Sequence, residues 1–317
     1  MTLDKSFLQY ENRRYGMDHD RYEWSMLHQR KPVIWPGDAK VALLIVPALE
    51  WFPLDMSNKP FAPPGAMSTA YPDLRHYTLR DYGNRVGIFR LMRILQARGL
   101  KVTAAINAAV VVRYPALLDS VREAGWEVIG HGIDMDHLHH SQRDADDEDT
   151  LIRTALEHLE KATGQMPRGW LSPAKSQSWA TLDLLQEHGI EYCCDWDNDD
   201  LPYDMKAGNG RLVSMPVSPD SDDFAILIKN HHTEASFAEQ IIDQFECLHA
   251  EAQRSGSGRV MSIALRPWVI GQPYRIGALE TVLDHILSRD SVWSATGSEI
   301  LTSWQAQQPN ARDMFGR

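Results

Sequence analysis

Short apolar runs alternate along this chain with segments whose apolar residues recur every three or four positions. The apolar runs predict strands at residues 41–46, 102–106, 127–129, 169–171, 192–194, 260–265 and near 292. The helical spacing, with glycine or basic stops, predicts helices at residues 87–95, 115–124, 146–163, 181–188, 237–252, 277–287 and through 304. Repeated strand–helix units of this kind indicate an α/β protein with a parallel sheet, open or closed into a barrel.

One long stretch interrupts the pattern. From Trp51 to about Tyr82 the chain is polar and rich in proline. Long loops without structure of their own are usually functional. We therefore expect this stretch to form a loop that acts as a lid or as a subunit contact.

Composition narrows the class of protein. The 317 residues carry a formal net charge of −11, which argues against binding to nucleic acid or to an anionic membrane surface. No apolar run is long enough to span a bilayer. We expect an N-terminal extension at residues 1–39, a single domain at 40–305 and a tail at 306–317. The polar N-terminus and three cysteines without disulfide or zinc spacing predict a cytoplasmic protein.

Polar side chains follow the predicted strands. Parallel strands bring their carboxyl ends to one edge of a sheet or barrel, so these side chains are expected to converge on one pocket. The strand ends present Glu50, Asn107, His131, Ser172, Asp195 and Arg266. His131 lies between two glycines and is followed by Asp134 and His137, which makes this segment a candidate metal or ligand site. His139 and His140, just beyond, are expected in a solvated loop.

Several segments, in this order, resemble the polysaccharide deacetylase (NodB-homology, carbohydrate esterase family 4) superfamily. The subgroup of metal-independent allantoinases and cyclic imide hydrolases is the most similar part of it. The matching segments are residues 41–50, 81–87, 125–132, 163–170, 189–195, 199–203, 264–267 and 271–276. The resemblance implies a distorted, incomplete (β/α) barrel.

The same resemblance implies catalytic roles for Glu50, His131 and Arg266. Metal-dependent members of the family have a second carboxylate near position 48 and a second histidine four residues after the first. Here those positions hold Ala48 and Met135, and Arg266 stands where the family has a histidine. Arginine holds an oxyanion but does not donate a proton at neutral pH. One divalent metal such as zinc, held by Glu50, His131, Asp134 and His137, and no metal at all are both compatible with these residues.

The leading hypothesis is a hydrolase of a non-peptide C–N bond in a small amide, cyclic imide or ureide. The alternative is a non-hydrolytic enzyme, or a non-catalytic binder of small molecules, on the same scaffold. We expect no nucleic-acid or membrane partner, and the resemblance suggests a homo-oligomer. The candidate substrate-binding residues are Arg85, Asn107, Trp170, Ser172, Asp195, Trp196, Trp268 and Arg275.

Overall fold

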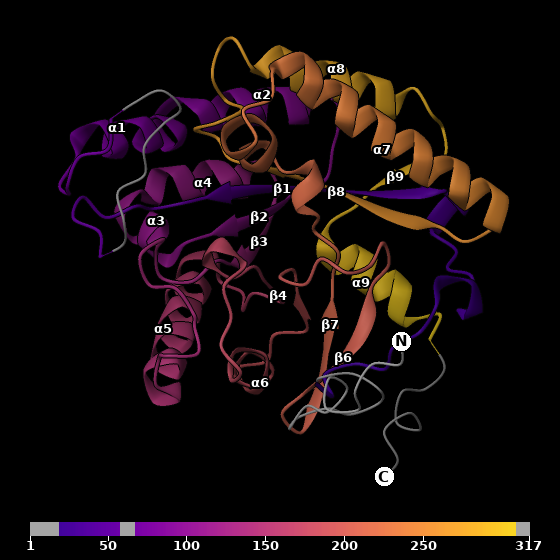
Figure 1. Ribbon diagram of the computed structural model, residues 1–317, viewed down its shortest axis with the longest axis horizontal. Coiled ribbons are helices and arrows are strands. Elements are labelled where there is room, and N and C mark those ends of the chain that lie inside the picture. Colours follow the sequence, from indigo (N-terminus) through magenta and orange to yellow (C-terminus); the bar gives the residue numbers. More distant parts are fainter. Residues whose placement is uncertain (1–18, 58–66, 309–317) are drawn as a thin grey trace, which may run out of the picture.

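The computed structural model describes residues 19–57 and 67–308, and its centre is a curled sheet (Figure 1). The strand order is β6-β7-β5-β4-β3-β2-β1-β8, with β9 paired to β1. The pairs are parallel except for the β6–β7 hairpin. The strands are β1 Val41–Leu49, β2 Thr103–Ile106, β3 Glu127–Gly130, β4 Gly169–Trp170, β5 Tyr192–Cys193, β6 Tyr203–Ala207, β7 Gly210–Ser214, β8 Arg259–Leu265 and β9 Val292–Ser294.

The barrel is incomplete because irregular chain, rather than a strand, covers the outer edge of β8. The N–H of Val260 donates to the carbonyl of Asp200 at 2.9 Å, and Asp222 forms an isolated parallel bridge to Ala264. The N–H of Ser218 also donates to the Ser262 hydroxyl at 2.9 Å. The expected distorted, incomplete (β/α) barrel is therefore confirmed.

Helices surround the sheet, with α2, α7 and α8 on one face and α9 near β7 (Figure 1). Two π-helical turns, Gly83–Gly87 and Phe224–Lys229, add to them. The helices are α1 Leu74–Tyr82, α2 Ile88–Ala97, α3 Ala108–Arg113, α4 Pro115–Glu123, α5 Ala145–Thr163, α6 Thr181–Glu187, α7 Glu234–Ser255, α8 Ile276–Leu287 and α9 Gly297–Gln305.

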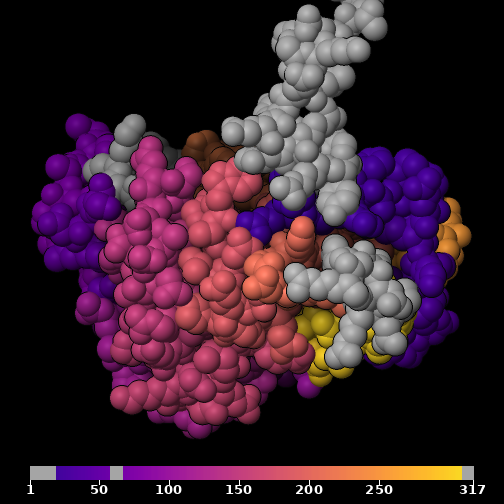
Figure 2. Space-filling view, turned by 90° about the horizontal axis from the view of Figure 1, so that it is seen from below, coloured from indigo at the N-terminus to yellow at the C-terminus, as the bar shows by residue number. Residues whose placement is uncertain are grey.

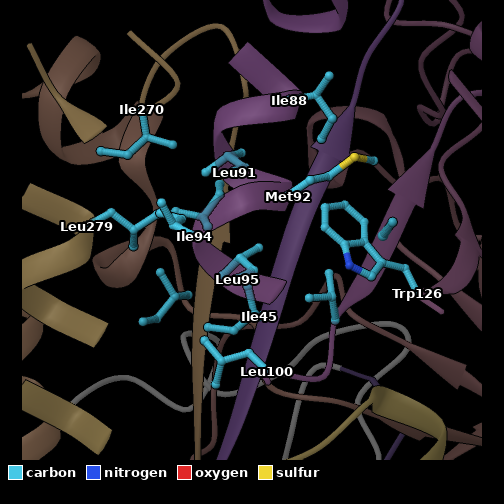
Figure 3. Close-up of a cluster of buried hydrophobic side chains, with 14 of the residues drawn as sticks. Ile45, Ile88, Leu91, Met92, Ile94, Leu95, Leu100, Trp126, Ile270 and Leu279 are labelled. Atoms are coloured by element: carbon cyan, nitrogen blue, oxygen red, sulfur yellow. The ribbon is translucent and has the colours of Figure 1, made fainter. Parts of the chain in front are cut away.

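Alternate residues of β1 face two different cores, as the two-residue period of a strand requires. Leu43 and Ile45 pack with α2, α7 and α8, in the cluster that Figure 3 shows around Ile45 and Leu279. Leu44 and Val46 face the inside of the curled sheet and belong to the cluster that contains α9. Both faces are buried, which explains why β1 is a continuous apolar run rather than an alternating one.

Three elements differ from the expectation. Residues 74–82, expected to be loop, form α1, which the Asp73 carboxylate caps by accepting the N–H of Arg75. This helix is polar and Leu74 is exposed, so apolar spacing gave no sign of it. The β6–β7 hairpin and the short helix α3 were also not predicted, although Gly208-Asn209-Gly210 is a turn sequence typical of hairpins. The part of the expected loop at residues 58–66 lies outside the described residues.

Residues near the N-terminus pack onto the domain. Val33 and Trp35 are buried in the cluster that contains α9, and the Trp35 indole donates to the carbonyl of Arg259 at 2.9 Å. Ile34 exchanges two hydrogen bonds with the Gln307 side chain, at 2.7 and 2.9 Å. Figure 2 shows indigo N-terminal residues beside yellow C-terminal ones on one flank. Among the helices of residues 19–57 and 67–308, none is long and apolar enough to cross a membrane.

Candidate active site

Three strands deliver the central residues of the site. Glu50 follows β1, His131 follows β3 and Arg266 follows β8. Each lies an even number of positions after a residue of the inner core of the curled sheet. Val46 on β1 is four positions before Glu50, and Ile129 on β3 and Ala264 on β8 are two positions before His131 and Arg266. Because side chains alternate along a strand, the three polar groups are directed toward the interior of the barrel.

Asn107, at the end of β2, holds the neighbouring strand ends in register. Its Oδ1 accepts the N–H of Trp51 at 2.7 Å, and its Nδ2 donates to the carbonyl of His131. Asn107 is fully buried and does not line the cavity described below. Its place indicates a positioning role rather than the substrate contact expected from the sequence.

The glycines on either side of His131 are required by packing. A Cβ on Gly130 would lie 2.3 Å from a ring carbon of Trp170, and one on Gly132 would lie 2.6 Å from Cγ of Pro173. Gly132 also has a φ of 67°, which favours glycine. The Gly-His-Gly sequence therefore fixes the imidazole in a tight turn.

The two ring nitrogens of His131 have different surroundings. Nδ1 lies 2.6 Å from the carbonyl of Leu171, so it carries the proton and donates it to that oxygen. Nε2 is buried without a hydrogen-bond partner among the described residues, and it lies 4.0 Å from Oε1 of Glu50. Burial lowers the pKa of His131, while the charge of Glu50 opposes this shift. The ring is therefore neutral near pH 7, with its Nε2 lone pair available as a base.

Both carboxylate oxygens of Glu50 accept hydrogen bonds. Oε1 accepts from Nε of Arg266 at 3.1 Å, and Oε2 accepts from the Trp268 indole at 3.1 Å. The backbone carbonyl of Glu50 is held by the Asn84 side chain at 2.9 Å. The Glu50 side chain is only 2% exposed, so these bonds replace the water that a buried carboxylate would otherwise need.

Arg266 lies between three carboxylates. Its Nη1 is 2.5 Å from Asp222 and 3.6 Å from Asp223, and its Nε binds Glu50. Burial alone would lower the pKa of Arg266, but Asp222 and the other two carboxylates raise it, so the guanidinium stays charged. Nη2 takes part in none of these bonds. Burial and the neighbouring Asp222 raise the pKa of Asp223 well above its usual range.

The turn that carries Arg266 is pressed against the π-helical turn Gly83–Gly87. A Cβ on Gly87 would lie 2.0 Å from the carbonyl of Pro267, so only glycine allows this approach. Asp223 holds the same turn from the other side, because its Oδ2 accepts the N–H groups of Arg266 and Ile270 at 2.8 and 3.2 Å. π-helical turns are frequent at functional sites, and here one lies on each side of the arginine.

Glu50, His131 and Arg266 border one cavity of about 380 Å³. Its wall is largely apolar, with Met135, Phe224 and Trp268 among the larger side chains. Ligand pockets are typically about 300–1,000 Å³ and are mostly apolar with a few polar groups, so this cavity suits a small molecule. Its polar lining consists of Glu50, Arg80, His131, Ser172, Lys175, Asp222, Lys229 and Arg266.

The structure separates the predicted substrate-binding residues into two sets. Ser172 and Trp268 line the cavity. The others lie elsewhere: Arg85 is exposed near Asp81, Trp170 is fully buried in the core, and Arg275 pairs with Glu234 at 3.2 Å. The remaining non-lining residues are Asn107, Asp195 and Trp196.

Asp195 and Trp196 support the site from behind. Asp195 accepts the N–H of Ser172 at 2.7 Å and the amide of Gln177 at 2.6 Å, so it fixes the loop that carries Ser172. The Trp196 indole donates to Gln177 at 2.8 Å, and its ring contacts Tyr22. Neither side chain lines the cavity. The polar atoms of both side chains bind Ser172 or Gln177 instead.

The candidate metal ligands do not converge. Asp134 accepts the N–H groups of Asp136 and His137 at 2.9 and 3.0 Å, and it pairs with Nδ1 of His137 at 2.7 Å. The two side chains thus form a closed turn that does not line the cavity. His139 is also not in solvated loop: it is 1% exposed, and its Nδ1 lies 3.3 Å from Glu148.

Sequence reasoning missed four polar residues of the cavity. Arg80 lies on α1, one helical turn before the predicted Arg85, and the missed helix is the reason it was overlooked. Asp222 and Lys229 lie in a segment where no element was expected. Lys175 and the preceding Ala174 have positive φ values of 53° and 54°. No sequence pattern predicts this backbone conformation, so the position of the Lys175 side chain was missed.

Comparison with known proteins agrees with this geometry. Residues 77–193 match the model of the family Polysaccharide deacetylase. The structure is similar to Puue allantoinase, with a TM-score of 0.77 and 26% identity over 87% of this chain and 93% of that one. A probable polysaccharide deacetylase from Pseudomonas aeruginosa PAO1 gives the same TM-score and identity, over 87% and 94% of the two chains. The peptidoglycan deacetylase of Helicobacter pylori is 23% identical over 263 residues, 73% of this chain and 88% of its own.

The match of sequence motifs, family model and structure defines a deacetylase-type hydrolase fold with its site at the strand ends. Over residues 77–193 the chain is similar to the polysaccharide deacetylase family.

The family implies a divalent metal, but the donors at this site do not fit one. A catalytic zinc takes about three protein ligands. Within residues 19–57 and 67–308 no group of three histidine, cysteine, aspartate or glutamate side chains is placed to hold a metal. A metal at Glu50 would also have to displace the bonds from Arg266 and Trp268 and lie beside a guanidinium charge.

Proposed function

We propose that this protein hydrolyses a C–N bond in a small amide, cyclic imide or ureide without using a metal ion. The observation that carries this proposal is the neutral, unpartnered Nε2 of His131 beside the Arg266 guanidinium, in a cavity of about 380 Å³. The cavity volume favours a small substrate over a polysaccharide chain. The similarity to a protein named allantoinase supports the same substrate class.

His131 is the better general base of the two candidates. Both oxygens of Glu50 already accept hydrogen bonds, one from Arg266 and one from Trp268. Nε2 of His131 is a free acceptor on a ring that its bond to Leu171 holds in place. A neutral imidazole with an open acceptor nitrogen in such a position is suited to activating water.

The reaction then follows from the positions of these groups. Water adds to the carbonyl carbon and gives one proton to Nε2 of His131, and the carbonyl oxygen becomes an oxyanion. Arg266 stabilises that negative charge, because Glu50 and Asp222 hold its guanidinium at the edge of the cavity. When the tetrahedral intermediate collapses, the C–N bond breaks and the leaving nitrogen takes the proton back from Nε2.

Glu50 supports both partners. It fixes the Nε edge of Arg266, and its negative charge, 4.0 Å from Nε2, stabilises the imidazolium that forms during the reaction. This role resembles that of a carboxylate that orients a catalytic histidine. The residue positions the reacting groups and is not required to take the proton itself.

The proposal is tested by turnover of a panel of amides, cyclic imides and ureides by the pure protein, after dialysis against a chelator and in its continued presence. We expect hydrolysis of at least one class, with a rate that the chelator does not change. Loss of activity with the chelator and recovery on adding zinc would contradict the metal-free mechanism. Tight binding of a panel compound with no turnover would instead favour the alternative, a small-molecule binder.

The expected homo-oligomer and cytoplasmic location stay predictions that we carry forward as proposals. Light scattering of the pure protein checks the first, and a monomer would contradict it. Fractionation of cells that express the full chain checks the second.

A further inference from the structure

One peptide group connects His131 to a second carboxylate. The carbonyl of Leu171, which lies 2.6 Å from Nδ1 of His131, belongs to the same peptide unit as the N–H of Ser172. That N–H donates to Oδ1 of Asp195 at 2.7 Å. Asp195 therefore reaches the imidazole through one planar amide and two hydrogen bonds, although its side chain does not line the cavity.

This peptide lies just past the carboxyl end of β4, between β3 and β5. The N–H of Leu171 still donates to the carbonyl of Gly130 at 2.9 Å, as in a parallel ladder. A strand that continued would bind backbone groups on both sides. Here the next peptide instead binds the His131 ring on the β3 side and the Asp195 carboxylate on the β5 side. An imidazole and a carboxylate thus lie at opposite ends of one amide.

Asp195 is held in this place by further donors. It is buried, and its Oδ2 accepts the amide of Gln177 at 2.6 Å and the thiol of Cys193 at 3.2 Å. Because Oε1 of Gln177 accepts the Trp196 indole at 2.8 Å, the nitrogen of that amide is the end that faces Asp195. Burial and the charge of Asp195 raise the pKa of Cys193 well above its ordinary value, so the thiol keeps the proton that it donates. Together with the Ser172 N–H, these donors fix the carboxylate in one orientation.

We propose that Asp195 is a positioning residue for the general base and that it acts on His131 through the Leu171–Ser172 peptide. This inference rests on the proposed hydrolytic function. When Nε2 takes a proton from water, positive charge spreads over the ring and strengthens the bond from Nδ1 to the carbonyl. A carboxylate at the N–H end of the same amide polarises it and makes the carbonyl oxygen a stronger acceptor. The Nδ1 proton stays on the ring, and no proton passes along the peptide.

The two carboxylates act on opposite sides of the imidazole. Glu50 lies 4.0 Å from Nε2, the nitrogen that takes the proton, whereas Asp195 acts on the Nδ1 side. Burial lowers the pKa of His131, and the charges of Glu50 and Asp195 both oppose this shift. Asp195 also determines which nitrogen is the base, because its hold on the peptide keeps the Leu171 carbonyl directed at Nδ1.

Asp195→Asn removes the charge and keeps an oxygen that accepts the Ser172 N–H. We expect kcat to fall about tenfold with KM within a fewfold of the wild type, the scale of replacing a charge-assisted hydrogen bond by a neutral one. Asp199→Asn is the matched control. Asp199 also accepts a backbone N–H, from Leu201 at 3.0 Å, and a side-chain donor, Arg30, but it does not line the cavity. Its substitution should leave kcat and KM unchanged.

A double-mutant cycle with His131→Asn separates positioning of the base from support of the fold. If Asp195 acts through the imidazole, the loss caused by Asp195→Asn disappears once the imidazole is absent. The double variant should then have the same kcat as His131→Asn alone. Losses that multiply in the double variant would assign Asp195 a general structural role and overturn the inference. An unchanged kcat in Asp195→Asn would overturn it as well.

Thermal melting checks that each variant is folded. In Asp195→Asn the new amide nitrogen faces the amide nitrogen of Gln177, which places two donors together. If this variant does not fold, the double variant Asp195→Asn, Gln177→Glu restores an acceptor opposite the new amide, and it takes the place of Asp195→Asn in the same cycle.

A measurement that needs no turnover separates the inference from the proposed function. The Nδ1 proton of His131, assigned by its loss in His131→Asn, is followed by NMR. Its chemical shift should decrease in Asp195→Asn, because the acceptor is weaker, and should stay constant in Asp199→Asn. No turnover by the wild type, with this change in shift, would overturn the hydrolytic function and support the contact between Asp195 and His131. Turnover with an unchanged shift and an unchanged kcat in Asp195→Asn would overturn the inference alone, and neither turnover nor a change in shift would overturn both.

Discussion

Two histidines eight residues apart in the loop after β3 are equally buried and have opposite surroundings. His131 is 3% exposed, with one nitrogen bonded to Leu171 and the other at the cavity without a partner. His139 is 1% exposed, faces Glu148 at 3.3 Å and lies against Trp170 with its ring centroid at 6.0 Å. Burial and residue type are the same in both. What distinguishes a reactive imidazole from a structural one is whether its second nitrogen faces the cavity or protein.

The largest effect is expected for His131→Asn. The asparagine amide reproduces the bond from Nδ1 to the Leu171 carbonyl and removes only Nε2. General-base catalysis contributes about 10²–10⁴-fold, so kcat/KM should fall by that factor while the melting temperature changes little. Steady-state kinetics on the best substrate of the panel measure it. Activity within a fewfold of the wild type would show that His131 is not the base.

Arg266→Lys should come next in size. Lysine keeps the positive charge but cannot bind Glu50 and Asp222 at once while facing the substrate. Loss of one oxyanion donor costs about 10²–10³-fold in kcat. We expect a fall of that order in kcat with a smaller change in KM. A variant that loses KM alone would assign Arg266 to substrate binding instead of to the transition state.

Much of this contrast was accessible from the sequence, and part of it was not. The apolar runs placed β1, β3 and β8 correctly, so the residues after them, Glu50, His131 and Arg266, were predicted as neighbours. The cavity residues Asp222 and Arg80 were not, because Asp222 lies just before a π-helical turn and Arg80 lies on a polar helix, and neither segment has an apolar period. The fold is confirmed. The candidate metal ligands after His131, Asp134 and His137, instead pair with each other.

Those local pairs explain why spacing alone misled. Asp134 and His137 are close enough in sequence to satisfy each other within one turn, and they do so. Short polar side chains compete in this way for nearby backbone N–H groups. His139 reaches Glu148 only through the fold, because β3 and α5 pack against each other. A sequence shows which polar side chains are present, but it does not show which of them bind each other in the folded protein.

His139→Leu, which has a similar size and no hydrogen-bond donor, tests the structural side of the comparison. The change removes the imidazole beside Glu148, which also accepts a hydrogen bond from Thr181 and is fully buried. Leaving a buried polar group without its partner costs about 1–3 kcal/mol. Denaturant unfolding should show a loss of stability of that size, with kcat/KM within a fewfold of the wild type. A large loss of activity at unchanged stability would show that His139 belongs to the catalytic machinery.

The smallest effect expected is a shift of the pH profile, and it depends on the same difference in surroundings. Burial lowers the pKa of His131 below its ordinary value of 6.5, so the neutral base persists as the pH falls through 6.5, and kcat/KM should decline only below that value. The free energy of unfolding depends on pH in the same direction. As the pH falls, His131 is protonated at a higher pH in the unfolded chain than in the folded protein. The stability due to neutral His131 is complete above about pH 6.5 and is lost progressively as the pH falls toward its folded pKa.

Glu50→Gln sharpens this test. The negative charge of Glu50 raises the pKa of His131 against the effect of burial, so its removal should move the acid limb of kcat/KM to still lower pH. The pH at which that limb falls measures the electrostatic coupling between Glu50 and His131, whose Oε1 and Nε2 atoms are 4.0 Å apart. The maximum of kcat/KM reports separately on any displacement of Arg266, which Glu50 binds. An acid limb that stays in place in Glu50→Gln and persists in His131→Asn would mean that His131 is not the group that titrates in catalysis.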